Sequence, residues 1–374
     1  MSQTHFHPAP TEDQAMILDL VSGFAKEELG PQGEAIDHDG VLPEALEEQL
    51  AEMGLLAIPI SEGNGGAGFD FTSYALSLVE LAKASATTAM HIVNQTNLFL
   101  EPMSEHAAGH QAFIDVASGT CRGALALNED ASSWLESSIQ MDCSGMVLNG
   151  SKKWVEGAAS ANWLIVAAKD TDGLSFFVVD AARPGINIAN GPSRLGFRTI
   201  PATDVTFSNV KVEEGDRLGP ANGGGEILAR IRRHGMTAAT AVACGIMAAA
   251  RDSAALYATE RKQFRRAIAN FEAIRQRLSS SEMGYGTGIN MLLSCARMID
   301  AGEDCTSLAR IAKVVSSQNA VKATDDALQV YGGYGVSQEY PAERFYRDAC
   351  CLGGLFGGND GISQEIAVSI LPAD

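Results

Sequence analysis

The sequence lacks a disulfide framework, a secretion signal and an apolar run long enough to cross a membrane. Its seven cysteines are scattered without CxxC spacing, and this odd count favours a reducing compartment, which we expect to be the cytoplasm. The first ten residues are polar and do not show the charged-then-apolar pattern of a signal peptide. The longest weakly polar run, Met236 to Ala250, is alanine-rich and too short to span a bilayer.

Positive charge is scarce as well. The 374 residues include 27 Lys and Arg against 46 Asp and Glu, so the formal net charge is −19. Such a surface repels phosphate backbones, which excludes nucleic acid as an expected partner. The local basic concentrations lie at Arg230 to Arg233 and at Arg261 to Arg266. The histidines show no metal-ligand spacing with nearby carboxylates, so we expect no metal site.

The remaining composition is that of a globular protein with room for two or three structural units, since 46% of residues are hydrophobic and 20% are charged. Apolar residues recur at helical spacing in the first third, as at Ile17, Leu20, Val21 and Phe24. From Glu226 onward the pattern is helical again, in three long pieces. Glycines at 284, 286 and 288 predict close packing or a kink in the middle piece.

The middle of the chain has a different period. Short apolar runs bounded by turn residues predict strands at Trp163 to Ala168, Ser175 to Asp180 and Val205 to Val212. Asn149-Gly150, flanked by apolar residues, predicts a tight turn between two strands of a hairpin. The order is therefore helices, β structure, helices.

Several short motifs occur in a fixed order along the chain. They are Asn149-Gly150-Ser151-Lys152-Lys153-Trp154, Leu195-Gly196-Phe197-Arg198, Glu260-Arg261-Lys262-Gln263-Phe264, Gln329 followed by Gly332-Gly333, and Arg347-Asp348-Ala349. Together they resemble the acyl-CoA dehydrogenase family of flavoenzymes. The resemblance implies a multi-part α+β fold: an N-terminal helical domain (1–120), a β-barrel-like middle domain (121–222) and a C-terminal four-helix bundle (223–374). It also implies a homodimer or homotetramer.

The same resemblance implies that FAD is the cofactor. Trp154 matches a tryptophan that packs on the flavin, and Arg261 matches a guanidinium that binds the diphosphate. Without the motif, Arg261 could be a solvated helix charge and Trp154 a core aromatic residue. In the family, the Gln329 and Gly333 positions belong to a neighbouring subunit and meet the same FAD. The expected FAD-binding residues are Asn128, Trp154, Arg261, Gln263, Phe264, Gln329, Gly332, Gly333 and Gln364.

The catalytic base is where the sequence departs most from the family, which uses a Glu before a Gly-Thr-Ser-Gln-like turn. Aligning Gly361-Ile362-Ser363-Gln364 with that turn makes Asp360 the base, after a short insertion; the alternative is a loop or capping residue. Glu156 stands where the family has a Thr near flavin N5. Three alternatives stay open for Glu156: its carboxyl group is protonated, its side chain is turned away from the flavin, or it is itself the acid/base group. A second family position for the base, near Gly235, offers no carboxylate.

The function implied by the resemblance is α,β-dehydrogenation of an acyl thioester on CoA or a carrier protein. A carboxylate takes the α-proton, a hydride passes to flavin N5, and an electron-transfer flavoprotein accepts the electrons. Two alternatives stay open, because Asn128, Glu156 and Ile362 each replace a Thr of the family pattern. One is a different reaction on the same fold, such as a desulfinase-like elimination, an oxidase or a monooxygenase. The other is a catalytically degenerate partner subunit.

Overall fold

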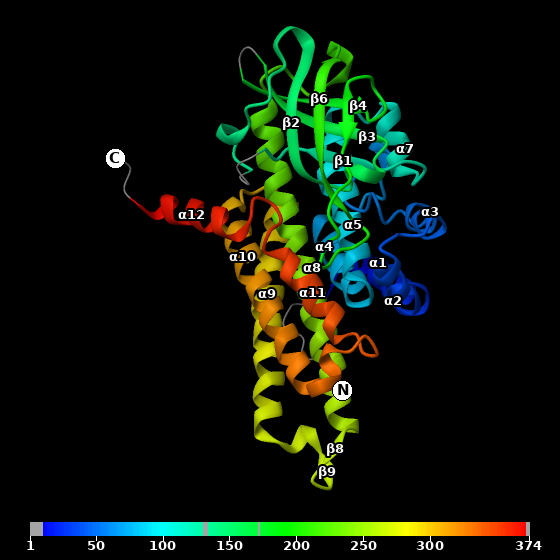
Figure 1. The fold of residues 1–374 in the computed structure, drawn as a ribbon, viewed down its shortest axis with the longest axis vertical. Helices are drawn as coiled ribbons and strands as arrows, with labels where there is room; N and C mark the ends of the chain where they lie inside the picture. Colours follow the sequence, from blue (N-terminus) through cyan, green and yellow to red (C-terminus); the bar gives the residue numbers. More distant parts are fainter. Residues whose placement is uncertain (1–9, 130–133, 171–172, 372–374) are drawn as a thin grey trace.

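The computed structural model describes residues 10–129, 134–170 and 173–371, and their elements form three parts. The β part lies at one end of the long axis, and the N-terminal helices pack beside the C-terminal bundle (Figure 1). The N-terminal part is helical. Side-chain caps begin several of its helices: Thr11 forms a capping box with Gln14, and Asp70 accepts a hydrogen bond from the Ser73 amide at 2.6 Å. Its elements are α1 (Glu12–Phe24), α2 (Gly30–Asp39), α3 (Glu44–Glu52), α4 (Phe71–Ala84), α5 (Ala86–Gln95), α6 (Glu101–His106) and α7 (Gln111–Ala117), with π-helical turns at Ala25–Leu29 and Thr96–Leu100.

The middle part consists of two sheets that share one apolar core. One sheet has the strand order β1-β3-β4-β7 and the other β2-β6-β5, and the core draws residues from both. The strands are β1 (Gly123–Ala126), β2 (Val147–Glu156), β3 (Trp163–Asp170), β4 (Gly173–Asp180), β5 (Ile186–Ile188), β6 (Ala202–Lys211) and β7 (Arg217–Leu218). The strands predicted from the apolar runs are therefore present.

The predicted hairpin at Asn149-Gly150 is wrong. Both residues lie inside the continuous strand β2, at a register shift in its pairing with β6. The Asn149 side chain accepts a hydrogen bond from the Asn209 amide at 2.8 Å, and Gly150 has φ 145°, so the two residues shape a bulge. An Asn-Gly pair is compatible with a bulge as well as with a turn. Which of the two forms here depends on the pairing of β2 with β6.

The C-terminal part is a helical bundle. Its elements are α8 (Gly224–Glu260), the hairpin β8 (Lys262–Gln263) with β9 (Arg266–Ala267), α9 (Glu272–Asp300), α10 (Thr306–Tyr331), α11 (Ala342–Leu352) and α12 (Asn359–Ile370). Helix α9 is continuous through its glycines, and a Cβ on Gly288 would lie 3.0 Å from the Cys244 sulfur of α8. The glycines thus serve helix packing. None of the described helices is long and apolar enough to cross a membrane.

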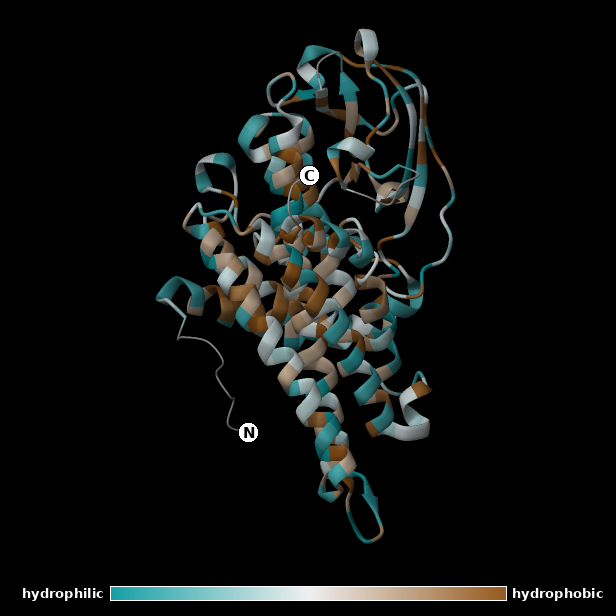
Figure 2. Ribbon diagram, turned by 90° about the vertical axis from the view of Figure 1, so that its left-hand side faces the viewer, coloured by the Kyte–Doolittle hydropathy of each residue, from teal (hydrophilic) through white to brown (hydrophobic). Residues whose placement is uncertain are grey.

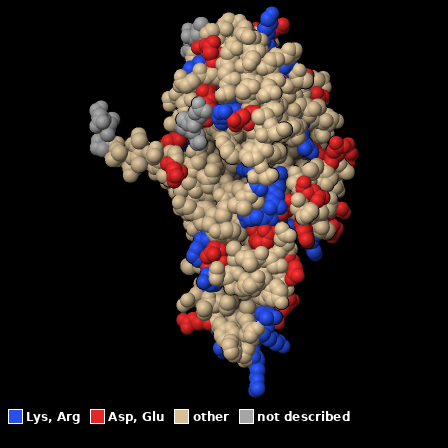
Figure 3. All heavy atoms as spheres, in the orientation of Figure 1, with Lys and Arg blue, Asp and Glu red and all other residues tan. Residues whose placement is uncertain are grey.

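Helix α8 is the longest of the described helices. It runs from beneath the β sheets to the far end of the bundle, where the β8–β9 hairpin protrudes (Figure 1). Apolar residues concentrate where α8 crosses the N-terminal helices, and the hairpin end is hydrophilic (Figure 2). Basic side chains gather at that end (Figure 3), where Lys262, Arg265 and Arg266 are exposed. Helix α12 projects from the side of the bundle.

Candidate active site

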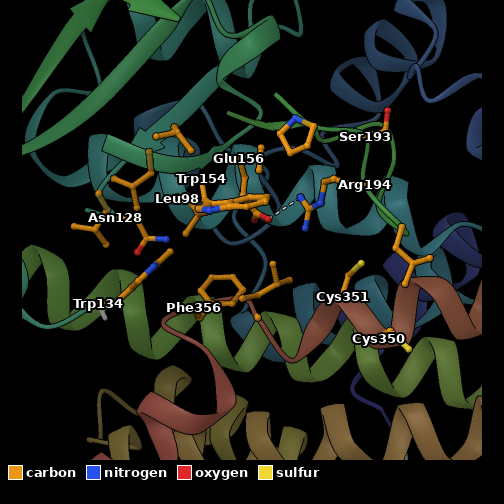
Figure 4. A pocket seen from close by; sticks show the side chains of 18 residues that line it. Leu98, Asn128, Trp134, Trp154, Glu156, Ser193, Arg194, Cys350, Cys351 and Phe356 are labelled. Atoms are coloured by element: carbon orange, nitrogen blue, oxygen red, sulfur yellow. Dashed lines mark hydrogen bonds and ion pairs between the residues drawn. The ribbon is translucent and has the colours of Figure 1, made fainter. Parts of the chain in front are cut away.

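A cavity of about 490 Å³ lies between the middle β domain and the bundle, and we name it the junction cavity (Figure 4). Strand β2, the loop before β6, the π-helical turn after α5 and the segment after α11 all contribute to its wall. The lining residues are Leu98, Leu125, Leu127, Asn128, Trp134, Trp154, Val155, Glu156, Pro192, Ser193, Arg194, Leu195, Ala202, Cys350, Cys351, Gly354, Leu355 and Phe356. Three predicted site residues, Asn128, Trp154 and Glu156, are thereby brought together.

One side of the junction cavity suits a flat ligand with polar edges. Trp154 lies at a second register shift of β2, has φ 51°, and leaves 57% of its surface exposed. Beside it, the Oδ1 atom of Asn128 is buried and has no hydrogen-bond partner among the described residues. A buried acceptor without a partner is costly unless a ligand satisfies it. An exposed aromatic face next to an unpaired amide oxygen fits the edge and face of an isoalloxazine ring.

Glu156 is paired with a residue that the sequence did not single out. Its Oε1 atom accepts a hydrogen bond from Arg194 Nη1 at 2.7 Å, and the same nitrogen donates to the Ile200 carbonyl at 2.8 Å (Figure 4). Among the described lining residues, Glu156 is the only carboxylate and Arg194 the only cationic side chain. The pair therefore supplies all the formal charge on this part of the wall.

The loop that carries Arg194 is held by the Arg-Asp-Ala motif of α11. Asp348 is buried and accepts a hydrogen bond from the Phe197 amide at 2.7 Å, while Arg347 donates to the Leu195 carbonyl at 2.9 Å. Burial raises the pKa of Asp348 to about 6. Arg347 also forms an ion pair with Asp37 of α2. The motif is thus an anchor that ties the cavity loop to two helices.

The opposite side of the junction cavity is aromatic. The rings of Trp134 and Phe356 have centroids 5.2 Å apart at an interplanar angle of 59°, and both residues are buried. Phe356 rests on Gly235 of α8, where a Cβ atom would lie 2.4 Å from the ring. The region near Gly235, where some family members keep the base, is therefore covered by a phenyl ring.

Asp360 and Gln364 lie outside the junction cavity. Both are exposed residues of α12, Asp360 in its first turn, and neither lines the junction cavity. An acidic residue in the first turn of a helix interacts favourably with the helix dipole. This position agrees with the alternative role of Asp360 as a loop or capping residue. The described chain gives no geometric support to Asp360 as the base.

A second group of predicted residues lines a groove at the far end of the bundle, which we name the bundle-end groove. It brings together Arg261, Gln263, Gly332 and Gly333. The remaining lining residues are Tyr257, Ile268, Val330, Tyr331, Tyr334, Ser337 and Glu339. The two glycines leave open space, because a Cβ atom at either would meet no heavy atom within 4 Å. A guanidinium beside backbone without side chains suits a diphosphate.

The expectation that Arg261 and the diglycine Gly332-Gly333 belong to different subunits is wrong. Arg261 and the diglycine lie in one groove of a single chain, because the ends of α8 and α10 run side by side; the rings of Tyr257 and Tyr331 are 4.3 Å apart. Phe264 is 87% exposed at the tip of the adjacent hairpin, and Gln329 is exposed just outside the groove.

The junction cavity and the bundle-end groove are far apart in one chain. Gly235 of α8 lies beside the junction cavity, and Glu260, the last residue of α8, directly precedes Arg261 of the bundle-end groove. About 25 residues of α8 separate Gly235 from Glu260. At 1.5 Å per helical residue this is about 38 Å, which is too long for one FAD to contact both sites. A shared FAD therefore requires the cavity of one chain and the groove of another.

The sequence analysis did not identify two cavity residues, Arg194 and Phe356. Arg194 directly precedes the quoted Leu195-Gly196-Phe197-Arg198 motif, so extending that motif by one residue would have included it. Phe356 directly precedes Gly357, just as the usual base precedes a glycine. Reading the segment after Ala349 without an insertion would have placed Phe356, rather than Asp360, at the base position.

Comparison with known proteins identifies the family of this chain. Family models match in three consecutive segments: acyl-CoA dehydrogenase N-terminal domain at residues 11–112, middle domain at 130–210 and C-terminal domain at 227–370. A probable acyl-CoA dehydrogenase of Bacillus subtilis, YngJ, is 32% identical over 91% of this chain and 93% of its own.

Two further similarities concern named activities. A 3-(aryl)acrylate reductase of Clostridium sporogenes is 29% identical over 96% of this chain and 99% of its own. Among solved structures, butyryl-CoA dehydrogenase of Megasphaera elsdenii superposes with a TM-score of 0.91 at 28% identity, covering 98% of this chain and all of the other.

Proposed function

The chain belongs to the acyl-CoA dehydrogenase family, and we propose that it is an FAD-dependent oxidoreductase acting on the Cα–Cβ bond of an acyl thioester. The observation that carries the proposal is the junction cavity. Among the described residues it combines an exposed Trp154, the unpaired amide oxygen of Asn128 and a single carboxylate, Glu156. A cavity of this size with few polar groups is typical of a small-molecule site.

We propose that two chains hold each FAD. Asn128 and Trp154 of one chain would meet the isoalloxazine end, and Arg261, Gln263, Gly332 and Gly333 of another would meet the diphosphate end. Support comes from the length of α8 between the sites and from the exposed aromatic residues Trp154 and Phe264. Phe264 and Gln329 would join this contact from the rim of the groove. A homodimer is the smallest assembly that satisfies this arrangement, and a homotetramer is a pair of such dimers.

Bound FAD would supply the two-electron acceptor for the hydride that leaves Cβ. Glu156 is our candidate for the group that takes the α-proton, because it is the carboxylate of the cavity wall. Arg194 orients it through the 2.7 Å hydrogen bond and leaves the second carboxylate oxygen for a proton. The apolar groups around it, Leu98, Leu355 and Phe356 among them, would exclude water. Asp360 stays the second candidate, with Gln364 on the same helix.

The remaining parts of the proposal follow the family. The thioester is carried by CoA or by a carrier protein, and the electron acceptor is an electron-transfer flavoprotein. We propose the cytoplasm as the location, which the seven free thiols support.

The test uses the purified full-length chain with added FAD. We expect a yellow protein of dimeric or larger size whose flavin absorbance bleaches when a saturated acyl-CoA is added without oxygen. A monomer that retains no flavin would overturn the proposal.

The same fold with a different reaction is a second candidate, and a specific observation favours it: the Phe356 ring covers Gly235, and the resemblance places a base near Gly235 in some family members. Reduction of a conjugated double bond, the chemistry in the name of the C. sporogenes relative, does not require a strong base. It adds a hydride from reduced FAD to Cβ and a proton to Cα, which a protonated Glu156 or water would supply. In that case the photoreduced enzyme would be reoxidised by an enoyl compound and not bleached by a saturated one.

A further inference from the structure

We propose that Phe356 and Trp134 form an aromatic wall that selects a flat aromatic acyl group over an aliphatic chain of the same carbon number. This inference rests on the proposed function, because it assumes that the junction cavity receives an acyl thioester. It concerns the side of the cavity opposite the polar pair Glu156–Arg194 (Figure 4).

The backbone at Phe356 is held in a conformation that residues with a side chain rarely adopt. Its φ is 56°, and the two residues that follow, Gly357 and Gly358, have φ 92° and 74°. The left-handed region is unfavourable for a bulky residue, so the surrounding structure must enforce it. Such a feature is typical of a site where the direction of one side chain matters.

A buried polar clamp enforces this turn. Lys313 of α10 is 1% exposed and donates hydrogen bonds to Asn359 Oδ1 at 2.8 Å and to the Gly353 carbonyl at 3.3 Å. The Asn359 side chain donates in turn to Ser317 Oγ at 3.0 Å. Both ends of the segment that carries Phe356 are therefore fixed to α10.

The ring itself is seated by residues that have no bulk. Gly235 leaves room for it on α8, since a Cβ atom there would lie 2.4 Å from Phe356 Cε1. A Cβ atom on Gly357 would lie 3.3 Å from the Trp134 backbone nitrogen, so this glycine lets the turn approach Trp134 closely. The result is a tilted pair of rings with centroids 5.2 Å apart.

Two uncharged rings at this angle offer a third ring both a face and an edge. Aromatic pairs gain attraction beyond their buried area when they meet offset or edge to face, whereas an alkyl chain gains only burial. Since the cavity keeps about 490 Å³ with both rings in place, the wall borders an open site and does not fill it. Its ligand would be a short acyl group ending in an aromatic ring.

The experiment compares two nine-carbon thioesters, 3-phenylpropionyl-CoA and nonanoyl-CoA, by anaerobic titration calorimetry. The bound FAD is photoreduced beforehand, so that neither ligand is oxidised during the titration. We expect the phenyl ligand to bind about tenfold more tightly, as suits a pair of aromatic contacts. In Phe356→Leu the preference should fall to about twofold or less, while nonanoyl-CoA affinity stays unchanged. Trp134→Leu is the second variant, in case the first does not fold.

Phe207→Leu is the matched control, because Phe207 is buried in the core of the β domain away from the cavity. It should keep the wild-type preference. Equal or tighter binding of nonanoyl-CoA by the wild type, or a preference unchanged in both wall variants, would overturn the aromatic wall alone. Binding of neither thioester would also overturn the wall, whereas a monomer that retains no flavin would overturn the proposed function as well.

Discussion

The junction cavity and the bundle-end groove differ in how far their residues lie apart in the sequence. The groove is built mainly from two short stretches, one at the end of α8 and one at the end of α10. The cavity takes its wall from segments between Leu98 and Phe356, which belong to all three parts of the fold. The groove residues are those that the resemblance to the family predicts, whereas the cavity differs from that expectation at Asn128, Glu156 and Phe356.

This difference teaches which part of the function is inherited and which is particular to this chain. In the proposed function the groove binds the diphosphate, which is the same in every FAD, so it needs the same guanidinium and the same open backbone. The acyl group and the proton transfer, which vary, are assigned by that proposal to the cavity. Single substitutions should therefore break one site without the other.

The largest expected effect is in the cavity, from Glu156→Gln. Loss of the proton-transferring carboxylate should lower the rate of anaerobic flavin bleaching about 100- to 10,000-fold while FAD stays bound. Asp360→Asn is the comparison variant and should change the rate by about twofold or less, a small change by the same standard. The reverse pattern would assign the base to α12.

Next in size is Arg261→Met in the groove. Removing a guanidinium that binds a diphosphate should weaken FAD affinity about 10- to 100-fold, the range for hydrogen bonds between charged groups. Flavin release during gel filtration measures it. Lys262→Met removes a neighbouring charge outside the groove and should retain FAD. Equal loss of flavin in both variants would mean that the hairpin acts through net charge alone.

A smaller effect is expected where the cavity meets α8. Gly235→Ala places a Cβ atom 2.4 Å from the Phe356 ring, so the ring or the helix must move, at a cost of about 1–3 kcal/mol. The urea midpoint reports this loss. Gly23→Ala is the control, since nothing lies within 4 Å of its Cβ position in α1, and it should stabilise by about 0.5–1 kcal/mol. A midpoint that rises in Gly235→Ala as much as in Gly23→Ala would mean that Phe356 moves freely.

The smallest effect is a pH dependence from the clamp behind Phe356. Burial lowers the pKa of Lys313 from 10.5 to about 7, so the unfolded chain binds more protons than the folded chain between these values. Stability should therefore rise with pH in this window, by about 1 kcal/mol between pH 7.5 and 8.5. Thermal midpoints across that range measure it. The rise should be smaller in Lys313→Met, and an identical slope would contradict the assignment to Lys313.

Local patterns predicted the architecture well. The three long C-terminal helices and the strands at Trp163, Ser175 and Val205 follow from periodicity, because each element buries one face along its own length. Asn149-Gly150 was misread, since its role depends on Asn209 in the paired strand β6. The short motif that contains Arg261 and Gln263 predicted residues of the bundle-end groove, because residues that are neighbours in the sequence are also neighbours in space.

The amino-acid sequence by itself determined the order of helical and β segments, the family, and the residue types at the end of α8. Those properties depend on contacts within one element or one turn. Only the tertiary structure decided that Arg194 holds Glu156, that Arg261 and the diglycine belong to one chain, and that Phe356 rather than Asp360 faces the cavity. These contacts join segments far apart in the chain, and their geometry follows from how the sheets and helices pack against α8.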